Sequence, residues 1–252
     1  MRPLAVSLGD PAGIGPEIIV ASWARRRESK LAPFFVVGGT TVLEKAAAVR
    51  DLACPIVPID DAAEANDAFD RGLPVLGAED GTYRPGVPDD AGAALALGSL
   101  AGAVRMALLG KASAAVTAPV SKAHLARVGF EFPGQTEFLA AACGLGPNDV
   151  VMMLAGPSLR AVPVTVHCAL ADVPRLLDTA NIAAKARITV AALTRDFGIA
   201  EPRIAICGLN PHAGEGGKFG SEERDIIAPA IETLRAEGMA ATGPHPADAL
   251  FT

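Results

Sequence analysis

Short apolar runs separated by longer stretches of helical periodicity dominate the first half of the chain. The runs "LAVSL" (4–8), "FFVVGG" (34–39) and "AAVTAPV" (114–120) predict buried strands. The stretch 89–111 is rich in small residues and predicts one long helix, whereas 60–88 is rich in Pro, Gly and Asp and is expected to be irregular. Because strands alternate with helices, this half predicts an α/β fold.

The pattern changes in the second half of the chain. Two apolar runs around "AGPSLR" predict an antiparallel hairpin over 149–167. A long helix is expected over 171–198 with Asp172 as its N-cap, followed by a strand over 203–210 and a helix over 221–238. The hairpin makes a mixed sheet the expectation for this half.

Composition narrows the class of protein. The chain of 252 residues carries a net charge of −6 and only 4% aromatic residues, which argues against a nucleic-acid partner. Its four cysteines form no C-x-x-C pair, as expected of reduced thiols in a cytoplasmic protein. We expect neither a signal peptide nor an apolar stretch of membrane-spanning length, and therefore no membrane partner.

A glycine-rich turn, "GDPAGIGPEI" (9–18), joins the first predicted strand to a helix. Backbone N–H groups at such a helix start would suit an anion, although the turn would equally serve the fold alone. It lacks the G-x-G-x-x-G spacing of the usual dinucleotide-binding turn.

Two further places carry candidate chemistry. Lys122 lies just beyond a predicted strand end, where α/β sheets place ligands, but a solvated surface lysine would fit there too. In "FPGQTEFLA" (132–140), Gln135 and Thr136 offer amide, hydroxyl and backbone N–H groups to a phosphate or carboxylate. The alternative is a capping motif with Thr136 as N-cap and Glu137 in the first turn.

Two histidines, His167 and His212, follow predicted strands on either side of a long predicted helix. A strand–helix–strand crossover brings such strand ends together, and two imidazoles can share a divalent metal. The glycines after His212 would let backbone approach a bound group. The alternative is a pair of unrelated polar residues. A third metal ligand would have to come from elsewhere, such as another subunit.

Five segments together resemble the 4-phosphohydroxy-L-threonine dehydrogenase family of vitamin B6 biosynthesis. They are, in order, "GDPAGIGPEI", "PGQTEFLA", "VTVHCALADVP", "GLNPHAGEGGKFGSEE" and "GPHPADALF". The resemblance spans almost the whole chain. It implies metal-dependent, NAD(P)-linked oxidation of 4-phosphohydroxy-L-threonine with decarboxylation to 3-amino-2-oxopropyl phosphate, in pyridoxal phosphate biosynthesis.

The resemblance also implies a fold like that of the isocitrate and isopropylmalate dehydrogenases. This is a two-domain α/β/α sandwich that forms a homodimer with a shared active site. We place the first α/β domain at 1–125 and the second, with the dimer interface, at 126–252. On this interpretation a C-terminal part is missing, and its residues are expected to complete the first domain.

The resemblance assigns roles to particular residues. It implies a divalent metal (Zn, Mg, Co or Mn) held by three histidines, of which two map onto His167 and His212. The third lies in a downstream "YHDQ"-like segment of the family. Asp248 matches a family aspartate near the metal and is, with Lys122, a candidate catalytic residue.

Substrate and cofactor contacts are expected from two further groups of residues. Gln135 and Thr136 stand at the positions of the family's substrate-binding pair. NAD or NADP is expected beside Asn210, which precedes His212, and beside three glycines of the run that follows it: Gly214, Gly216 and Gly217.

Two departures from the family pattern leave the substrate open. Gln135 stands where the family usually has His, and Ser121 stands where it commonly has a His before the lysine. Glutamine donates a hydrogen bond but carries no charge. One alternative is therefore a paralogue that oxidises another hydroxy acid, such as a four-carbon sugar-acid phosphate or a dihydrodiol carboxylate. The other is a non-catalytic, ligand-binding dimer, because this sequence lacks the third histidine.

Overall fold

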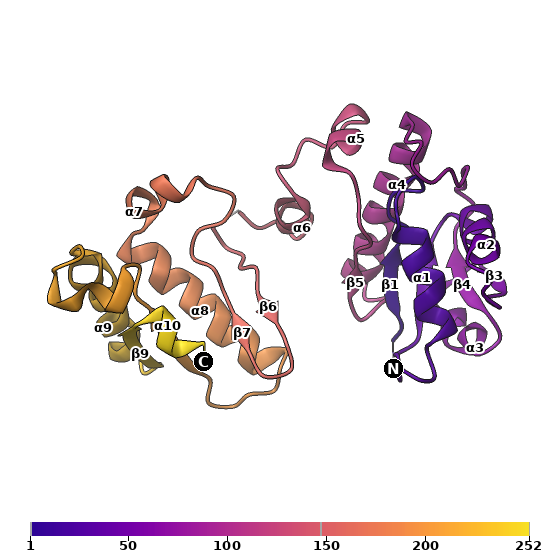
Figure 1. Cartoon of the computed structure of the whole chain (residues 1–252). Helices are drawn as coiled ribbons and strands as arrows, with labels where there is room; N and C mark the ends of the chain where they lie inside the picture. Colours follow the sequence, from indigo (N-terminus) through magenta and orange to yellow (C-terminus); the bar gives the residue numbers. More distant parts are fainter. Residues whose placement is uncertain (1, 147, 252) are drawn as a thin grey trace. The chain divides into compact units, whose positions relative to one another are not determined.

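The protein divides into two compact units (Figure 1). The computed structural model describes residues 2–146 and 148–251, and its contacts group Met1–Leu139 as unit 1 and Ala140–Thr252 as unit 2. The domain boundary expected from the sequence, after residue 125, falls inside a helix of unit 1, α5 (Lys122–Arg127). Each unit has its own core.

Unit 1 is built on a five-stranded, entirely parallel sheet with the order β3-β4-β2-β1-β5. Its strands are β1 (Leu4–Ser7), β2 (Phe34–Val37), β3 (Ile56–Ile59), β4 (Leu73–Leu76) and β5 (Ala115–Val116). This parallel sheet confirms the predicted α/β class. The expectation of irregular structure over 60–88 was wrong, because the apolar run of β4 lies inside that stretch.

Helices cover both faces of this sheet (Figure 1). They are α1 (Gly15–Ala24), α2 (Thr40–Val49), α3 (Ala65–Phe69) and α4 (Asp90–Leu108), with a short 3-10 turn, η1 (Ala62–Glu64). Successive side chains of a strand point to opposite faces. Phe34 therefore packs in a cluster with Leu43 of α2, whereas Phe35 packs in a second cluster with Ala103 of α4.

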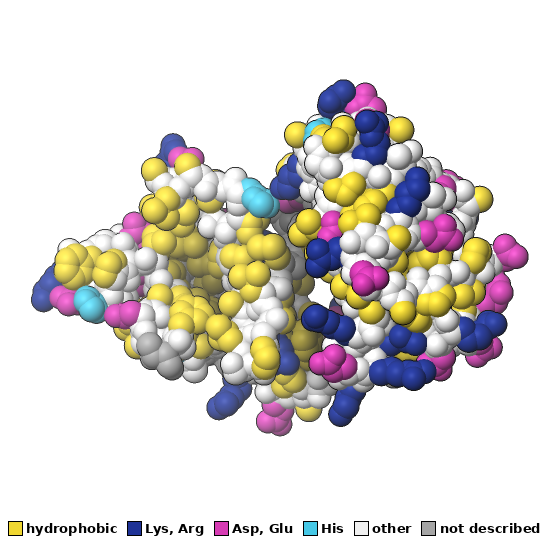
Figure 2. Space-filling view, turned by 45° about the vertical axis from the view of Figure 1, so that its right-hand side comes forward, with side chains coloured by type: hydrophobic (Ala, Val, Ile, Leu, Met, Phe, Trp, Pro, Cys, Tyr) yellow, Lys and Arg dark blue, Asp and Glu magenta, His cyan; other side chains and the backbone are white. Residues whose placement is uncertain are grey.

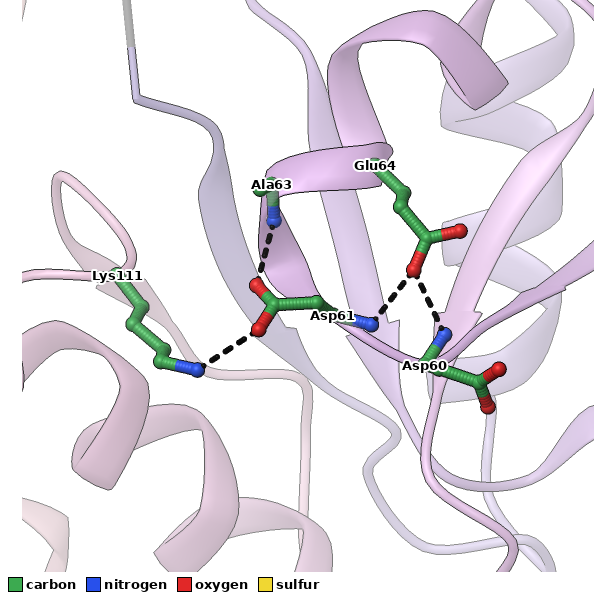
Figure 3. A network of polar contacts seen from close by, with 5 residues as sticks. All are labelled: Asp60, Asp61, Ala63, Glu64 and Lys111. Carbon is green, nitrogen blue, oxygen red and sulfur yellow. Dashed lines mark hydrogen bonds and ion pairs between the residues drawn. The ribbon is translucent and has the colours of Figure 1, made fainter.

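The chain leaves β3 through a polar network (Figure 3). Asp61 Oδ1 accepts from Ala63 N at 3.0 Å, and Glu64 Oε1 accepts from Asp61 N at 2.8 Å and from Asp60 N at 3.2 Å, which forms a capping box. Lys111 Nζ lies 3.0 Å from Asp61 Oδ2. The Ala63 N–H and then Lys111 lower the pKa of the Asp61 carboxyl. These contacts fix the turn that leads from β3 into α3.

Helix α4 is long and apolar enough, by length and composition alone, to cross a membrane. The expectation that the chain has no such stretch was therefore wrong. In this structure Leu100 and Ala103 of α4 are fully buried, and Ser99 Oγ donates to Val37 O at 2.6 Å. One face of α4 therefore packs on the sheet of unit 1, as a core helix does.

Unit 2 contains two small sheets. β6 (Leu154–Ala155) and β7 (Arg160–Ala161) form an antiparallel hairpin, and β8 (Arg203–Cys207) pairs in parallel with β9 (Ala240–His245). The hairpin agrees with the sequence pattern, although each of its strands has only two residues. The segment 162–167, expected to be its second strand, forms none.

The expected helix over 171–198 is broken in two. α7 (Val173–Leu176) is followed by Asp178, whose Oδ1 accepts from Asn181 N at 2.8 Å and starts α8 (Thr179–Arg195). Asp178, and not Asp172, is therefore the side-chain N-cap. The elements that follow β8 are η3 (Pro211–Gly216), a π-helical turn η4 (Glu223–Ile227), α9 (Ala228–Ala236) and, after β9, α10 (Ala247–Leu250).

The core of unit 2 is one apolar cluster. Ile182 and Ala186 of α8 pack there with Ile231 and Leu234 of α9 and with Ala241 of β9. The loop that carries η3 follows β8 directly, so this cluster supports the base of the loop.

Candidate functional site

The glycine-rich turn after β1 packs against the loop after β5. Asp10 N donates to Pro119 O at 3.1 Å, and Ala118 N donates to the buried Ser7 Oγ at 3.1 Å. Gly9 has a φ of 75°, and a Cβ there would lie 2.8 Å from Pro119 O. Glycine is therefore required for the close approach of two loops at the carboxyl end of the sheet, which supports the structural interpretation of this turn.

Lys122 is the exposed first residue of α5, and its side chain reaches the start of α6 (Gln135–Ala142). A Cβ built on Gly134 would lie 3.4 Å from Lys122 Nζ and 3.0 Å from Glu137 Oε2. This Oε2 atom is buried and has no hydrogen-bond partner among the described residues. An ammonium and a carboxylate thus approach the same glycine, so Lys122 is not an isolated surface lysine.

The predicted substrate pair, Gln135 and Thr136, occupies the first turn of α6. Phe138 N donates to Gly134 O at 3.2 Å, so Gly134 holds the N-cap position. The capping motif with Thr136 as N-cap was therefore wrong, although Glu137 does lie in the first turn. The first backbone N–H groups of α6 are the ones that a helix leaves without an intrahelical partner.

In unit 2, His167 and His212 share an unusual backbone conformation. Their φ angles are 54° and 53°, in the left-handed region that side-chain-bearing residues rarely adopt. Such residues cost about 1–3 kcal/mol each and cluster at functional sites. His124 and His245 are not among the residues of positive φ. The backbone therefore singles out the same two histidines as the sequence pattern.

The left-handed conformation continues through the glycine-rich run after His212. From His212 to Gly217 every φ lies between 43° and 98°. Gly214 adopts such a conformation at little cost, whereas Ala213 and Glu215 do not. The left-handed backbone of this run is therefore a physical reason for its glycines.

His212 has a carboxylate partner. Its Nδ1 lies 3.9 Å from Asp248 Oδ2 of α10, and the two side chains are 61% and 69% exposed. A carboxylate on one ring nitrogen orients an imidazole and leaves the other nitrogen for a metal. The structure thus brings together two of the residues that the sequence singled out.

The two histidines alone do not make up a metal site. Within 2–146 and 148–251, no three or more His, Cys, Asp or Glu side chains are grouped so as to hold a metal ion. His245 Nε2 instead lies 2.9 Å from Thr242 Oγ1. Exposed imidazoles, one of them with a carboxylate 3.9 Å from Nδ1, are donors that fit a divalent metal such as zinc.

Asn210, a predicted cofactor contact, is already engaged by carboxylates of its own chain. Its Nδ2 donates to Glu222 Oε2 at 2.8 Å and to Glu223 Oε2 at 3.0 Å. Sequence reasoning missed these two glutamates. The sequence signal that could have found them is two adjacent glutamates just after the last glycine and Ser221.

A cleft of about 420 Å³ in unit 1 was also missed. It lies at the carboxyl ends of β3 and β4 and is lined by Asp60 and Asp80 among others, but by none of the residues predicted from the sequence. Asp80 Oδ2 accepts from Thr41 N at 2.8 Å. Desolvation would raise the pKa of Asp80, but hydrogen bonds led by those from Thr41 lower it overall. This carboxylate therefore helps to anchor the start of α2.

Comparison with known proteins gives three similarities. A family model described as pyridoxal phosphate biosynthetic protein PdxA matches residues 30–252. The chain is 63% identical to the 4-hydroxythreonine-4-phosphate dehydrogenase of Erythrobacter litoralis, over 100% of this chain and 75% of that protein. A crystal structure of the Klebsiella pneumoniae 4-hydroxythreonine-4-phosphate dehydrogenase superposes with a TM-score of 0.89 at 36% identity, over 100% of this chain and 77% of that one.

A more distant similarity is to a terephthalate 1,2-cis-dihydrodiol dehydrogenase from Burkholderia xenovorans. Its structure superposes with a TM-score of 0.64 at 31% identity, over 99% of this chain and 75% of that one. The chain thus spans about three quarters of the length of these relatives.

Proposed function

Because the chain belongs to the family of pyridoxal phosphate biosynthetic protein PdxA, we propose that it oxidises 4-hydroxythreonine 4-phosphate with NAD or NADP and releases CO₂ and 3-amino-2-oxopropyl phosphate. The observation that carries this proposal is the 63% identity to a 4-hydroxythreonine-4-phosphate dehydrogenase along the whole chain. The same similarity to named dehydrogenases argues against a non-catalytic dimer.

His167 and His212 are proposed to hold a divalent metal, either zinc, magnesium, cobalt or manganese. When bound, the metal would supply Lewis acidity that lowers the pKa of the substrate hydroxyl. Asp248 would orient the imidazole of His212 through Nδ1 and so keep Nε2 directed at the site. The left-handed backbone at both histidines supports this assignment.

The groups of unit 1 are proposed to handle the polar ends of the substrate. Gln135 and Thr136, with the free N–H groups at the start of α6, suit its phosphate. The Lys122 side chain, beside the same helix start, would stabilise negative charge as the ammonium or, as the neutral amine, accept the proton of the substrate hydroxyl.

The nicotinamide cofactor is proposed to lie beside the glycine-rich run of unit 2. Asn210, Gly214, Gly216 and Gly217 are the residues proposed to contact it. The support is the exposure of Gly216 and Gly217 and the absence of a G-x-G-x-x-G turn after β1. The Asn210 amide would contribute through its remaining carbonyl oxygen, since Nδ2 is held by Glu222 and Glu223.

We further propose a two-domain sandwich of the isocitrate dehydrogenase type, with domains near 1–125 and 126–252, and a cytoplasmic homodimer with a shared active site. Exposed apolar side chains of unit 2 support the homodimer. Leu170 is 87% exposed and Leu154 is 61% exposed. Figure 2 shows hydrophobic side chains on the surface of the molecule. Apolar surface of this kind is typical of an interface.

A second candidate substrate is a dihydrodiol carboxylate. Two observations favour it: Gln135 replaces the usual family histidine, and the chain resembles a terephthalate dihydrodiol dehydrogenase with a TM-score of 0.64. A neutral amide in place of an imidazole would weaken the hold on a doubly charged phosphate.

One assay separates these functions. The full-length protein is incubated with 4-hydroxythreonine 4-phosphate, NAD⁺ and a divalent metal, and NADH absorbance is followed with and without a chelator. Rapid, chelator-sensitive NADH formation is expected. No NADH from this substrate, with NADH from a cis-dihydrodiol carboxylate, would contradict the proposal and establish the second candidate.

A further inference from the structure

Glu223 carries a buried carboxylate that the mechanism above does not use. The residue is only 6% exposed and begins the π-helical turn η4. Its Oε1 accepts from Asn210 N at 2.7 Å, and its Oε2 accepts from Asn210 Nδ2 at 3.0 Å. Both oxygens of Glu223 are thus bound by one residue, which lies two positions before His212.

The glycine-rich loop closes around this carboxylate. A Cβ on Gly214 would lie 2.7 Å from Glu223 Oε2, and a Cβ on Gly208 would lie 3.1 Å from Glu223 Oε1. Backbone on both sides of His212 therefore approaches Glu223 so closely that a side chain has no room at Gly214.

The loop held in this way is strained. His212, Ala213 and Glu215 all have left-handed φ angles between 43° and 53°. A run of this kind persists only when its surroundings fix it. The contacts from Glu223 to Asn210 before the run, and its close approach to Gly214 within it, are the fixing contacts that the structure shows.

We propose that Glu223 is a positioning residue for the metal site: its carboxylate clamps the loop Asn210–Gly217 and thereby fixes the direction of the His212 imidazole. The inference rests on the proposed function, in which His212 is a metal ligand. Glu223 itself touches neither metal nor substrate. It acts on the backbone of the loop, whereas Asp248 lies near the imidazole ring of His212.

The test measures Co²⁺ affinity of the full-length protein by titration calorimetry, with circular dichroism as the check on folding. Glu223→Gln keeps the size of the side chain but turns an NH₂ donor toward the Asn210 donors. Loss of an outer-shell partner typically weakens metal binding by about 10–100-fold, and this is the expected effect. The matched control is Glu232→Gln on the exposed face of α9, which is expected to bind Co²⁺ as the wild type does.

His212→Ala separates this inference from the proposed function. If His212→Ala abolishes Co²⁺ binding while a folded Glu223→Gln protein binds as tightly as the control, the positioning role is overturned and the metal site stands. If His212→Ala binds Co²⁺ normally, the metal site itself is wrong and the inference falls with it.

A second variant covers the case in which Glu223→Gln does not fold. Asn210→Ala keeps the buried carboxylate and its bond from the backbone N–H, and removes the side-chain amide with its Nδ2 bonds to Glu222 and Glu223. Co²⁺ binding several-fold weaker than in the control is expected. Unchanged affinity in this folded variant would overturn the proposal.

Discussion

The two units use left-handed backbone for different purposes. In unit 1 the non-glycine residues of positive φ are Lys30 and Asp51, which follow helical turns. Asp51 N donates to Ala48 O, and the next N–H donates to Ala47 O, a pattern that ends helices generally. In unit 2 the left-handed residues include His167 and lie in loops.

The polar groups near the strand ends differ in the same way. In unit 1, Ser7 and Ser99 are buried hydroxyls that satisfy backbone N–H groups of neighbouring segments. In unit 2, the exposed His212 is held by a strained loop around a buried glutamate. Unit 1 thus has the features of a stable frame, and unit 2 stores strain where the histidines are. We therefore expect left-handed backbone in loops, more than position on a sheet, to mark the functional residues of this protein.

The largest effect that tests this contrast between the two units is expected at His212. His212→Gly should lower kcat/KM by about 10³-fold or more, since a metal centre supplies several kcal/mol to the reaction. It should also raise the free energy of unfolding by about 1 kcal/mol, because relief of left-handed strain outweighs the added unfolded-state entropy of glycine. The measurements are NADH kinetics and urea unfolding.

The matched control in unit 1 is Asp51→Gly, at a φ of 52°. A similar gain in stability is expected there with unchanged kcat/KM. Full activity of His212→Gly would show that the strain in unit 2 has no function.

The core of unit 1 should respond in the opposite sense. Leu100→Ala removes a fully buried side chain of α4 and should lower the free energy of unfolding by about 3 kcal/mol. Val49→Ala, at a side chain that is 68% exposed, should change it by less than about 0.5 kcal/mol. Equal effects in urea unfolding would contradict the account of unit 1 as the stable frame.

A smaller effect is expected from the buried hydroxyl of Ser99. Its Oγ accepts from Leu8 N at 2.7 Å and donates to Val37 O at 2.6 Å. Ser99→Ala leaves both backbone groups without this partner and should cost about 2 kcal/mol. Ser113→Ala, which loses only a 3.2 Å bond to Pro3 O, should cost less than about 1 kcal/mol. A reversed order in thermal unfolding would rule out the proposed role of Ser99.

The smallest effect concerns Tyr83, and this effect appears only at high pH. Burial, and then its hydrogen bond to Glu17, raise the pKa of Tyr83 to about 12 from an ordinary value of 10.0. Because the folded pKa lies above the unfolded one, this contribution to stability is complete below pH 10 and is lost as the pH rises toward 12. Unfolding measured between these values should therefore show a decline that Tyr83→Phe lacks. An identical decline in both proteins would contradict this assignment.

The sequence pattern predicted those parts of the fold whose apolar runs are long or strongly periodic. β1, β2 and α4 lie close to their expected ranges. β4 was missed because Pro74 interrupts its short apolar run and Gly72 and Gly77 flank it, and β9 because it contains Gly243 and Pro244. The break between α7 and α8 was missed because Asp178 also fits a polar position on one continuous helix. Only the structure shows that its carboxylate caps α8.

The candidate site could be proposed from the sequence by residue type, but its conformation could not. Sequence pattern and family resemblance singled out His167, His212 and Asp248, and the structure places His212 Nδ1 3.9 Å from Asp248 Oδ2. The left-handed backbone of the two histidines could not be read from the sequence, because tertiary contacts set it. Glu223 was missed for the same reason, since a glutamate after a glycine run is ordinarily an exposed helix start.

The most direct test of the central claim, that the strained histidines of unit 2 hold a metal, is anomalous diffraction from crystals of the full-length protein grown with Zn²⁺. The account predicts an anomalous peak about 2.0–2.1 Å from an imidazole nitrogen of both His167 and His212. A peak bound by other residues, or no peak at these two histidines in crystals of an active enzyme, would contradict it.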